Sequence, residues 1–395
     1  MVEWKKLGEV CSLKARIGWQ GLTQKEHRTT GEYLLVTGTD FTSNYEVDFD
    51  HCVYVDEDRY TQDPNIQLKP RDVLITKDGT LGKMAIIENL PKPATLNGGL
   101  FVIRDLTGKL HHKYLLHYML SSKFQNIIES NHTNGTIKHL TQALLTNFPI
   151  PIPTLIEQER IVGILDTFTS SIDNLKQQIA QRRKQYEYYR DQLLDLEGKE
   201  GVEMKTLGEV CEIKGRIGFR GYTREDQVAK GEGALSLTAT NIINQRIDYN
   251  NNTYITWEKY YESPEIMVQN GDIIVCQRGS IGKIAFVENL IEKATINPQL
   301  LLIKNIKIRN RFLSYYLLSR FFQNDLSQII GHGTVQMIAQ KDFRNLVIPI
   351  PSLSEQQRIV DILDKFESCI QNLEAQLSQR EKQYEYYRNK LLTFE

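Results

Sequence analysis

Two glycine-bounded turns are the first place to look for chemistry in this chain. GTLGK (Gly79–Lys83) recurs as GSIGK (Gly279–Lys283), and glycines followed by a lysine are typical of phosphate-binding loops. The nucleotide-binding form needs four residues between its glycines and a Ser or Thr after the lysine. Here two residues separate Gly79 from Gly82, and Met84 follows Lys83. The turns therefore do not match a nucleotide-binding loop.

Other catalytic and metal-binding patterns are also missing from the sequence. There is no GxGxxG dinucleotide fingerprint. INPQ (Ile296–Gln299) falls short of the NPPY-type motif of amino-methyltransferases, and His111, His112 and His132 lack the spacing of zinc ligands. We therefore expect no catalytic residues, no metal site and no cofactor in this chain. This interpretation favours a recognition device over an enzyme.

Composition bounds the class of protein but does not identify a partner. The 395 residues suffice for two or three domains, and 41% apolar with 25% charged residues is typical of a globular chain. Five cysteines without a CxxC pair argue against a disulfide framework and favour a reducing, cytoplasmic setting. No apolar run predicts a membrane span. The formal net charge of −1 gives no support by itself for nucleic-acid binding.

The chain is a tandem duplication. KQYEYYR at Lys184–Arg190 recurs without change at Lys382–Arg388, an offset of 198 residues. LGEVC at Leu7–Cys11 recurs at Leu207–Cys211, an offset of 200, so the second copy has lost two residues in between. A period near 200 is far longer than that of a solenoid repeat.

Each copy ends in a predicted long helix, over 154–197 and 352–395. Apolar residues follow steps of four and three, the seam of a coiled coil, and Arg182 and Arg380 interrupt the seam at matched positions. Thr154-x-x-Glu157 and its counterpart at Ser352 predict capping boxes at the helix starts. Because a helix with one apolar stripe needs a partner, we expect the two helices to pair as an antiparallel coiled coil.

Residues 1–153 and 204–351 carry the strand and turn signals, and the polar stretch 198–203 links the copies. Buried strands are predicted at Arg71–Thr76 and Gly271–Gln277, each entering a glycine turn. A helix is predicted at His112–Ser130, with a counterpart near Arg311–Ile330. The predicted fold class is therefore α+β: two similar globular domains separated by two long helices, with pseudo-two-fold tandem symmetry.

The order of variable domain, long helix, variable domain and long helix resembles the specificity subunit of Type I restriction–modification enzymes, the HsdS family. The duplicated junctions PIPTLIEQERIVGILD (Pro151–Asp166) and PIPSLSEQQRIVDILD (Pro349–Asp364) carry the resemblance, which covers essentially the whole chain. It implies that 1–153 and 204–351 are target recognition domains, each reading half of a bipartite site in double-stranded DNA. The helices would set the spacing and bind two methyltransferase (modification) subunits, which restriction subunits join.

The resemblance also implies that this subunit is not catalytic. S-adenosylmethionine, ATP and Mg would belong to the partner subunits, and no membrane would be involved. Two other readings stay open: a coiled-coil adaptor with two protein-binding domains, and a self-sufficient DNA-modifying enzyme, which the missing motifs disfavour.

Basic and polar residues near the glycine turns are the candidates for DNA binding. Lysines and arginines that match between the copies would bind phosphate. Bases would be read by positions that differ between the copies, which are Gln20 against Arg220 and Lys77 against Gln277. The alternative is that the turns are structural, and Trp19 and Phe219 are predicted to pack in the core. The candidates are Lys14, Arg16, Gln20, Lys77, Lys83, Lys214, Arg216, Arg220, Gln277, Arg278 and Lys283.

The repeated heptapeptide is the candidate for partner binding. Tyr186, Tyr189, Tyr384 and Tyr387 fall on the apolar seam and are predicted to pack there. Residues off the seam recur as well, either because recombination kept the copies alike or because one surface binds two identical partners. The candidates are Lys184, Glu187, Tyr188, Arg190, Lys382, Glu385, Tyr386 and Arg388.

Overall fold

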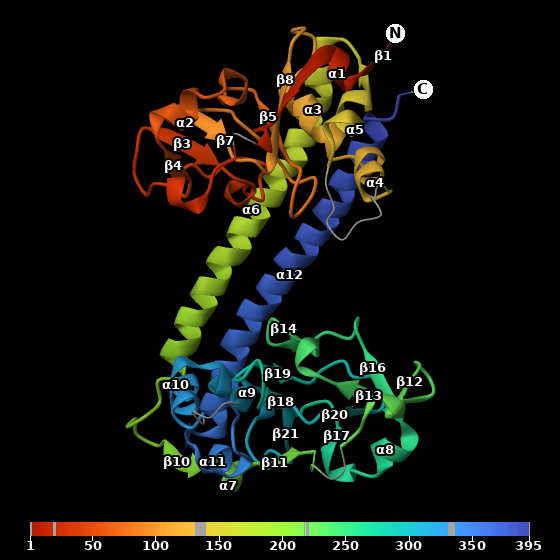
Figure 1. Cartoon of the computed structure of the whole chain (residues 1–395). Coiled ribbons are helices and arrows are strands. Elements are labelled where there is room, and N and C mark those ends of the chain that lie inside the picture. Colours follow the sequence, from red (N-terminus) through yellow and green to blue (C-terminus); the bar gives the residue numbers. More distant parts are fainter. Residues whose placement is uncertain are drawn as a thin grey trace. The chain divides into compact units, whose positions relative to one another are not determined.

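The computed structural model describes residues 2–18, 21–130, 140–216, 218, 221–330 and 336–394. The chain forms two compact units, one of Met1–Gln178 with Leu373–Glu395 and the other of Ile179–Asn372. Each unit contains one globular domain and a part of both long helices, α6 (Leu155–Leu193) and α12 (Leu353–Leu391), which Figure 1 shows in green and blue. Within the described residues, no helix is both long and apolar enough to cross a membrane.

The described residues of the first unit form three small sheets. A four-stranded sheet has the order β2-β8-β5-β6 and a three-stranded sheet the order β4-β3-β7, with β3 and β7 parallel. The antiparallel pair β1–β9 closes the domain next to the start of α6. The bounds are β1 Glu3–Lys6, β2 Cys11–Lys14, β3 Tyr33–Val36, β4 Val53–Val55, β5 Val73–Thr76, β6 Met84–Ile86, β7 Ala94–Leu96, β8 Leu100–Asp105 and β9 Pro149–Ile152.

The second unit repeats this plan with additional short strands. Its larger sheet has the order β11-β21-β18-β19-β15-β14, its second sheet β12-β16-β13-β20-β17, and β10 pairs with β22. The bounds are β10 Glu203–Thr206, β11 Glu212–Gly215, β12 Gln227–Val228, β13 Gly233–Leu237, β14 Ile242–Ile243, β15 Arg246–Ile247, β16 Thr253–Thr256, β17 Met267–Val268, β18 Ile273–Cys276, β19 Ile284–Phe286, β20 Ala294–Ile296, β21 Leu300–Lys304 and β22 Val347–Ile350.

Short helices connect these strands. In the first unit they are α1 Leu7–Val10, α2 Glu57–Thr61, α3 His112–Met119, α4 Ser122–Ser130 and α5 Gln142–Asn147, with single 3-10 turns at Gln24–Glu26, Gly38–Asp40 and Pro64–Ile66. In the second they are α7 Leu207–Val210, α8 Trp257–Tyr261, α9 Asn310–Leu318, α10 Arg320–Gln328 and α11 Gln340–Asn345, with 3-10 turns at Arg224–Asp226, Ala239–Asn241 and Pro264–Ile266.

The buried strands predicted at Arg71–Thr76 and Gly271–Gln277 are confirmed as β5 and β18. The single helix predicted at His112–Ser130 is wrong in one respect, because the chain breaks into α3 and α4. The break at Ser121, like the matching break at Ser319, has a local cause. Each serine hydroxyl donates to the carbonyl of a tyrosine three residues earlier, and a new helix starts directly after it.

The two long helices pack together, as the seam predicted. In the first unit Phe168 of α6 stacks on Tyr387 of α12, with ring centroids 5.3 Å apart; in the second Tyr189 stacks on Phe366 at 5.4 Å. An early residue of one helix thus meets a late residue of the other, so the helices run antiparallel within each unit. At the helix starts, the Thr154 hydroxyl accepts a hydrogen bond from the backbone amide of Glu157, and the Ser352 hydroxyl accepts one from that of Glu355. Both bonds are 3.3 Å long.

The described residues of each unit form two buried apolar clusters, one of which combines the domain with the long helices. In the first unit, Ile161, Leu165 and Ile172 of α6 and Tyr384 of α12 join the domain residues of a single buried cluster. In the second unit, Ile359 and Leu363 of α12 and Tyr186 of α6 do the same. The apolar stripe of each helix is therefore covered partly by the other helix and partly by a domain.

Candidate nucleic-acid interface and partner surface

The glycine turns lie at one edge of each larger sheet. In the first unit Thr76 at the end of β5 pairs with Leu100 at the start of β8, and Lys14 at the end of β2 pairs with Val102. The described segments that leave this edge are 15–18, 21–23, 77–83 and 97–99. Because β3 is parallel to β7, the 3-10 turn Gly38–Asp40 leaves in the same direction. We call this set of loops, with its equivalent in the second unit, the recognition edge.

The turn after β5 has the same backbone in both copies. The Gly82 amide donates to the carbonyl of Thr76, and the Gly282 amide to that of Cys276, both at 3.1 Å. Gly79 has φ +72° and Gly82 +76°; the matching glycines of the second copy have +76° and +82°. Other residues rarely adopt such values, so glycine is required by the turn itself. The frame is shared, and only its side chains differ between the units.

Arg16 and Arg216 do not lie on the surface of this edge. Arg16 is 2% exposed; its Nε donates to the carbonyl of Leu96 at 2.9 Å, and a terminal nitrogen donates to Thr95 Oγ1 at 3.1 Å. Arg216, 7% exposed, makes the same two bonds to Ile296 and Thr295. Both arginines therefore hold the start of a glycine loop against the end of a strand, β7 in the first unit and β20 in the second. This geometry favours a structural role over a phosphate contact.

The other basic and polar candidates divide by exposure. Lys14, Lys83, Lys283 and Arg278 are exposed. Lys214 is half-buried and forms an ion pair with Glu212 at 3.0 Å.

Lys77 and Gln277 are engaged within the edge itself. The Lys77 ammonium lies 5.3 Å from the centre of the Phe101 ring, and the Gln277 amide nitrogen donates to the carbonyl of Pro298 at 3.0 Å. Gln20 and Arg220, together with Trp19 and Phe219, lie outside the described residues.

The turns Asn97–Gly99 and Asn297–Gln299 also lie at this edge, although neither was predicted as a DNA-binding candidate from the sequence. The amide of residue 77 donates to the Gly99 carbonyl, and that of residue 277 to the Gln299 carbonyl, both at 2.9 Å. The repeat ATLNGGL against ATINPQL, at the constant offset of 200, was the signal that could have identified them. These turns lie directly beside the glycine turn.

The site offers binding groups and no evident chemistry. Among the described residues, no three His, Cys, Asp or Glu side chains are arranged to hold a metal ion. Burial raises the pKa of the Cys11 and Cys211 thiols to about 12, so both stay protonated and unreactive near neutral pH. Exposed ammonium and guanidinium groups on glycine turns can bind phosphate and base edges.

The repeated heptapeptide divides into a buried and an exposed half. Tyr186 and Tyr384 are buried, whereas Tyr188 and Tyr386 are 60% and 59% exposed. Lysine and glutamate at the first and fourth positions are exposed in both copies, as Lys184, Glu187, Lys382 and Glu385.

Arg190 belongs to the buried half, and Arg388 is half-buried. Arg190 is 7% exposed and lies over the ring of Tyr186, and Arg388 lies over the ring of Tyr384. This geometry gives both arginines a part in fixing the helices to the domains.

The residue after the heptapeptide connects helix and domain in both units. Asp191 accepts a hydrogen bond from the Arg320 amide at the start of α10, and Asn389 accepts one from the Ser122 amide at the start of α4, both at 3.2 Å. The end of each long helix is thus bonded to its domain in the same way. In both units this arrangement leaves the same tyrosine of the heptapeptide exposed.

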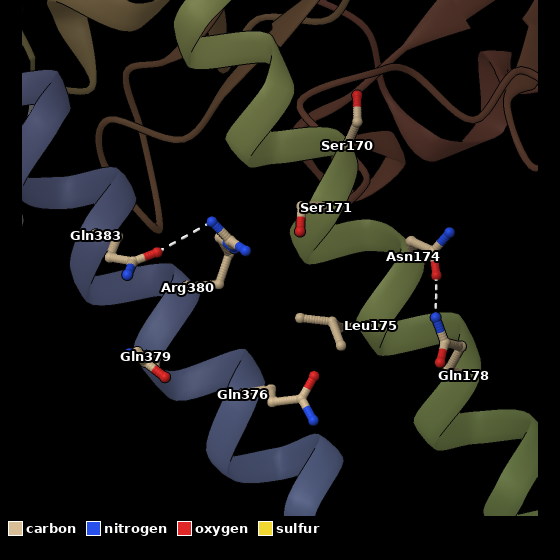
Figure 2. Close-up of a pocket in the computed structure, with 9 residues that line it drawn as sticks. All are labelled: Ser170, Ser171, Asn174, Leu175, Gln178, Gln376, Gln379, Arg380 and Gln383. Atoms are coloured by element: carbon tan, nitrogen blue, oxygen red, sulfur yellow. Dashed lines mark hydrogen bonds between the residues drawn. The ribbon is translucent and has the colours of Figure 1, made fainter.

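A polar cavity of about 510 Å³ separates α6 and α12 in the first unit. Figure 2 shows it at the height where Arg380 interrupts the apolar seam, with Leu175 pointing toward α12 and Arg380 bonded to Gln383. Its lining is otherwise rich in amides and hydroxyls: Ser170, Ser171, Asn174, Gln178, Gln376 and Gln379. The interruption predicted from the sequence therefore corresponds to a local gap in apolar packing.

The Type I restriction modification DNA specificity domain is the family model that this chain matches, over residues 1–182 and again over 199–381. The chain belongs to this family. It is a DNA specificity subunit of a Type I restriction–modification system, a recognition component and not the catalytic one. The resemblance drawn from the duplicated junctions is thereby confirmed, as are the two α+β domains.

Known relatives match most or all of the length of this specificity subunit. The EcoR124I/EcoR124II specificity subunit of Escherichia coli is 29% identical, over 100% of this chain and 94% of that protein. A putative type I specificity subunit of Haemophilus influenzae, S.HindORF215P, is 29% identical over 72% of this chain and 73% of its own length.

Solved structures share the fold. The S subunit of a Mycoplasma genitalium Type I system matches with a TM-score of 0.56 at 16% identity, covering 100% of this chain and 97% of that one. A chain from a study of the assembly and conformational transition of a type I R-M system matches at 0.60 with 20% identity, covering 99% and 96%.

Proposed function

We propose that each unit of this subunit reads one half of a bipartite target in double-stranded DNA through its recognition edge. The target recognition domains would then be 1–153 and 204–351. The helices within 154–197 and 352–395, joined by the linker 198–203, would set the spacing between the half-sites. Lys14, Lys83, Lys283 and Arg278 would provide the charged contacts, and Arg16 and Arg216 would position the loops.

One observation carries this proposal: the two recognition edges share a backbone frame and differ in the side chains on it. The hydrogen bonds at Gly82 and Gly282 have equal lengths, and each of the paired arginines donates to the matching threonine hydroxyl at 3.1 Å. A frame used twice with different side chains is what reading two different half-sites requires, because phosphate contacts position the protein and base contacts specify the sequence.

We further propose that the exposed half of the heptapeptide binds one methyltransferase (modification) subunit in each unit. An exposed tyrosine flanked by Lys and Glu occurs at the same place twice, as an interface to two identical partners demands. Tyrosine is enriched among the residues that dominate binding energy at interfaces. We assign the docking role first to the exposed side chains Lys184, Glu187, Tyr188, Lys382, Glu385 and Tyr386. The half-buried Arg388 stays a candidate, and the buried Arg190 would support the helix.

The catalytic chemistry belongs to the partners in this proposal. Methyltransferase subunits would bind S-adenosylmethionine, and restriction subunits, where present, would use ATP and Mg. The complex would act in the cytoplasm, where it meets the DNA.

Binding to DNA is the first test. The subunit assembled with its modification subunits should select a bipartite sequence from random duplex DNA, and the logarithm of its affinity should fall linearly with the logarithm of salt concentration. Selection of no sequence, together with capture of a protein ligand by the isolated domains, would favour a coiled-coil adaptor instead.

Partner docking is tested by changing Tyr188 and Tyr386 together to alanine. Affinity for the modification subunit should fall on the order of tenfold or more per site, while the thermal unfolding of the specificity subunit stays unchanged. Tyr261→Ala is the matched control, because Tyr261 is 55% exposed and lies outside the heptapeptide. Equal affinity of the double variant and the control would refute the docking surface.

A further inference from the structure

We propose that Gln299 reads an adenine in the second half-site and that the buried Gln277 holds it in place for this contact. Both roles rest on the proposed DNA-reading function, and they name two residues that perform it. Gln277 was expected from the sequence to read a base, whereas Gln299 was not a candidate. The geometry of the turn Asn297–Gln299 favours the reverse.

The backbone of Gln299 is fixed beside the glycine turn of the second unit. Its amide donates to Asn297 Oδ1 at 2.9 Å, and its carbonyl accepts from the Gln277 amide at 2.9 Å. The intervening Pro298 has no N–H, so the Asn297 side chain bonds to the next amide along the chain. Because both backbone polar groups of Gln299 have partners, its side chain is the group that this residue offers to a ligand.

Gln277 supports this turn from within the domain. It is 9% exposed, and its Nε2 donates to the carbonyl of Pro298 at 3.0 Å and to that of Leu300 at 3.4 Å. These two carbonyls precede and follow Gln299. Since its amide nitrogen bonds inside the chain, Gln277 positions the turn and does not itself reach DNA. A residue that reads a base needs such support, because it must be held within about 0.5 Å of its productive position.

The exposed Gln299 side chain has the hydrogen-bonding groups that adenine requires. Its Oε1 accepts from Asn297 Nδ2 at 3.4 Å, a contact longer than most N–H···O hydrogen bonds. This contact orients the amide, while the oxygen keeps a second lone pair and the nitrogen can donate. One acceptor and one donor side by side match the N6 amino group and the N7 atom of adenine in the major groove.

The first unit has neither of these two amides. Gly99 stands in place of Gln299, and Lys77, in place of Gln277, lies over the Phe101 ring at 5.3 Å. Neither Gly98 nor Gly99 has a positive φ, and a Cβ atom added to Gly98 would meet nothing within 4 Å. The shared backbone therefore does not demand glycine in this turn. The buried and the exposed amide occur together in one copy and are replaced together in the other, as paired roles in one half-site require.

The experiment uses the complex of this subunit with its modification subunits to select from random duplex DNA, which is then sequenced. Gln299→Ala should weaken the preference for adenine at one base pair of the second half-site by about 5- to 150-fold. Gln299→Glu should shift the preference at that base pair toward cytosine, because a carboxylate accepts from the cytosine amino group. All other base pairs, including the whole first half-site, should stay unchanged, which shows that each variant complex is folded.

Gln269→Ala is the matched control for an exposed glutamine of the same domain. Gln269 follows β17, which pairs with the start of β20, whereas Gln299 lies beyond the end of β20. This variant should keep the wild-type preference at every base pair.

A double variant tests the positioning role. Gln277→Ala should weaken the preference at the same base pair as Gln299→Ala. In the Gln277→Ala background, Gln299→Ala should have little further effect, because a reader without its support has already lost its geometry. If Gln277 only stabilised the domain, the two changes would act independently and their effects would multiply.

Four results would overturn the inference. Gln299→Ala could leave every base preference unchanged, or the effects of the two alanine variants could multiply. Gln299→Glu could lose the adenine preference without any shift toward cytosine, which would show that Gln299 supports the turn and does not contact the base. In these three cases the wild-type complex still reads a bipartite site, so the proposed function stands. If the wild-type complex selects no bipartite sequence, the proposed function fails and the inference fails with it.

Discussion

The hydroxyl of Tyr384 and Nδ1 of His117 lie 2.9 Å apart, although 267 positions separate the two residues. The contact joins α12 to α3 within the first unit, and the other ring nitrogen of His117 lies 2.9 Å from Asp166 Oδ1 on α6. In the second unit Tyr315 takes the place of the histidine beside Tyr186, and its hydroxyl donates to Asp364. One joint between domain and helices therefore contains an imidazole, whose pKa burial lowers from 6.5, and its counterpart contains a tyrosine at that place.

The first prediction concerns the pH dependence of this joint. Burial lowers the pKa of His117 below its ordinary value of 6.5, despite the opposing effect of Asp166. Below pH 6.5 the unfolded chain binds a proton that the folded chain binds more weakly. The free energy of unfolding should therefore fall as pH drops from 6.5 toward the folded-state pKa, by at most about 1.4 kcal/mol per pH unit. Denaturant unfolding at pH 7.5 and 5.5 measures it.

Two variants isolate the contribution of His117. His117→Tyr copies the second unit, and His117→Gln keeps polar contacts without a titration in this range; both should reduce the loss of stability between pH 7.5 and 5.5. The pKa of His111 is also lowered by burial, so part of the dependence should remain. Burial alone would raise the pKa of Asp166, but the hydrogen bonds with His117 and Lys113 lower it below 3.8. Protonation of this carboxylate therefore does not contribute to the change of stability between pH 7.5 and 5.5. A pH dependence identical in all three proteins would contradict the assignment.

The second prediction concerns the duplicated junction. Gln158 is fully buried; its amide nitrogen donates to the carbonyls of Lys109 and Pro153, and its oxygen accepts from the His111 amide. Gln158→Ala leaves these buried groups without partners, so it should lower the free energy of unfolding by about 1–3 kcal/mol. Glu159→Ala, on the exposed neighbouring residue, should change it by less than about 0.5 kcal/mol. Chemical denaturation of both variants decides the point, and equal effects would remove the special role of Gln158.

The third prediction separates positioning from contact at the recognition edge. Arg16→Lys keeps the charge but loses the planar guanidinium that reaches Thr95 and Leu96 together. Sequencing of selected DNA should show a weaker base preference in the first half-site and an unchanged preference in the second. The variant should also have a lower melting temperature. If Arg16 instead grips phosphate, the lysine variant should bind all sequences slightly less well without a change of preference.

The fourth prediction concerns the matched exposed lysines. Lys83→Ala and Lys283→Ala should each weaken binding of the complex to every DNA sequence by a similar factor and reduce the salt slope by about 1. Preference among sequences should not change, because phosphate carries no sequence information. Titrations at several salt concentrations measure both quantities. A lysine variant that alters a half-site and keeps the salt slope would show that the residue reads bases.

Local patterns in the sequence were enough to predict much of the fold. Steps of four and three identify the long helices, since side chains at that spacing share one helix face. The strands at Val73–Thr76 and Ile273–Cys276 follow from short apolar runs that end in glycine turns. The break between α3 and α4 was missed, because a serine in an otherwise helical pattern can lie within a helix or cap a new one.

The sequence by itself determined the duplication, the two α+β domains, the paired helices and the family, because each depends on residues close together or on a comparison of the copies. The tertiary structure alone decided which candidate side chains are available. Arg16 is buried by residues about 80 positions away, and Tyr384 by His117 at 267 positions. The exposure of a side chain depends on such distant contacts, which composition and spacing do not reveal. The residues of KQYEYYR therefore separate into a buried and an exposed half only when the chain is folded.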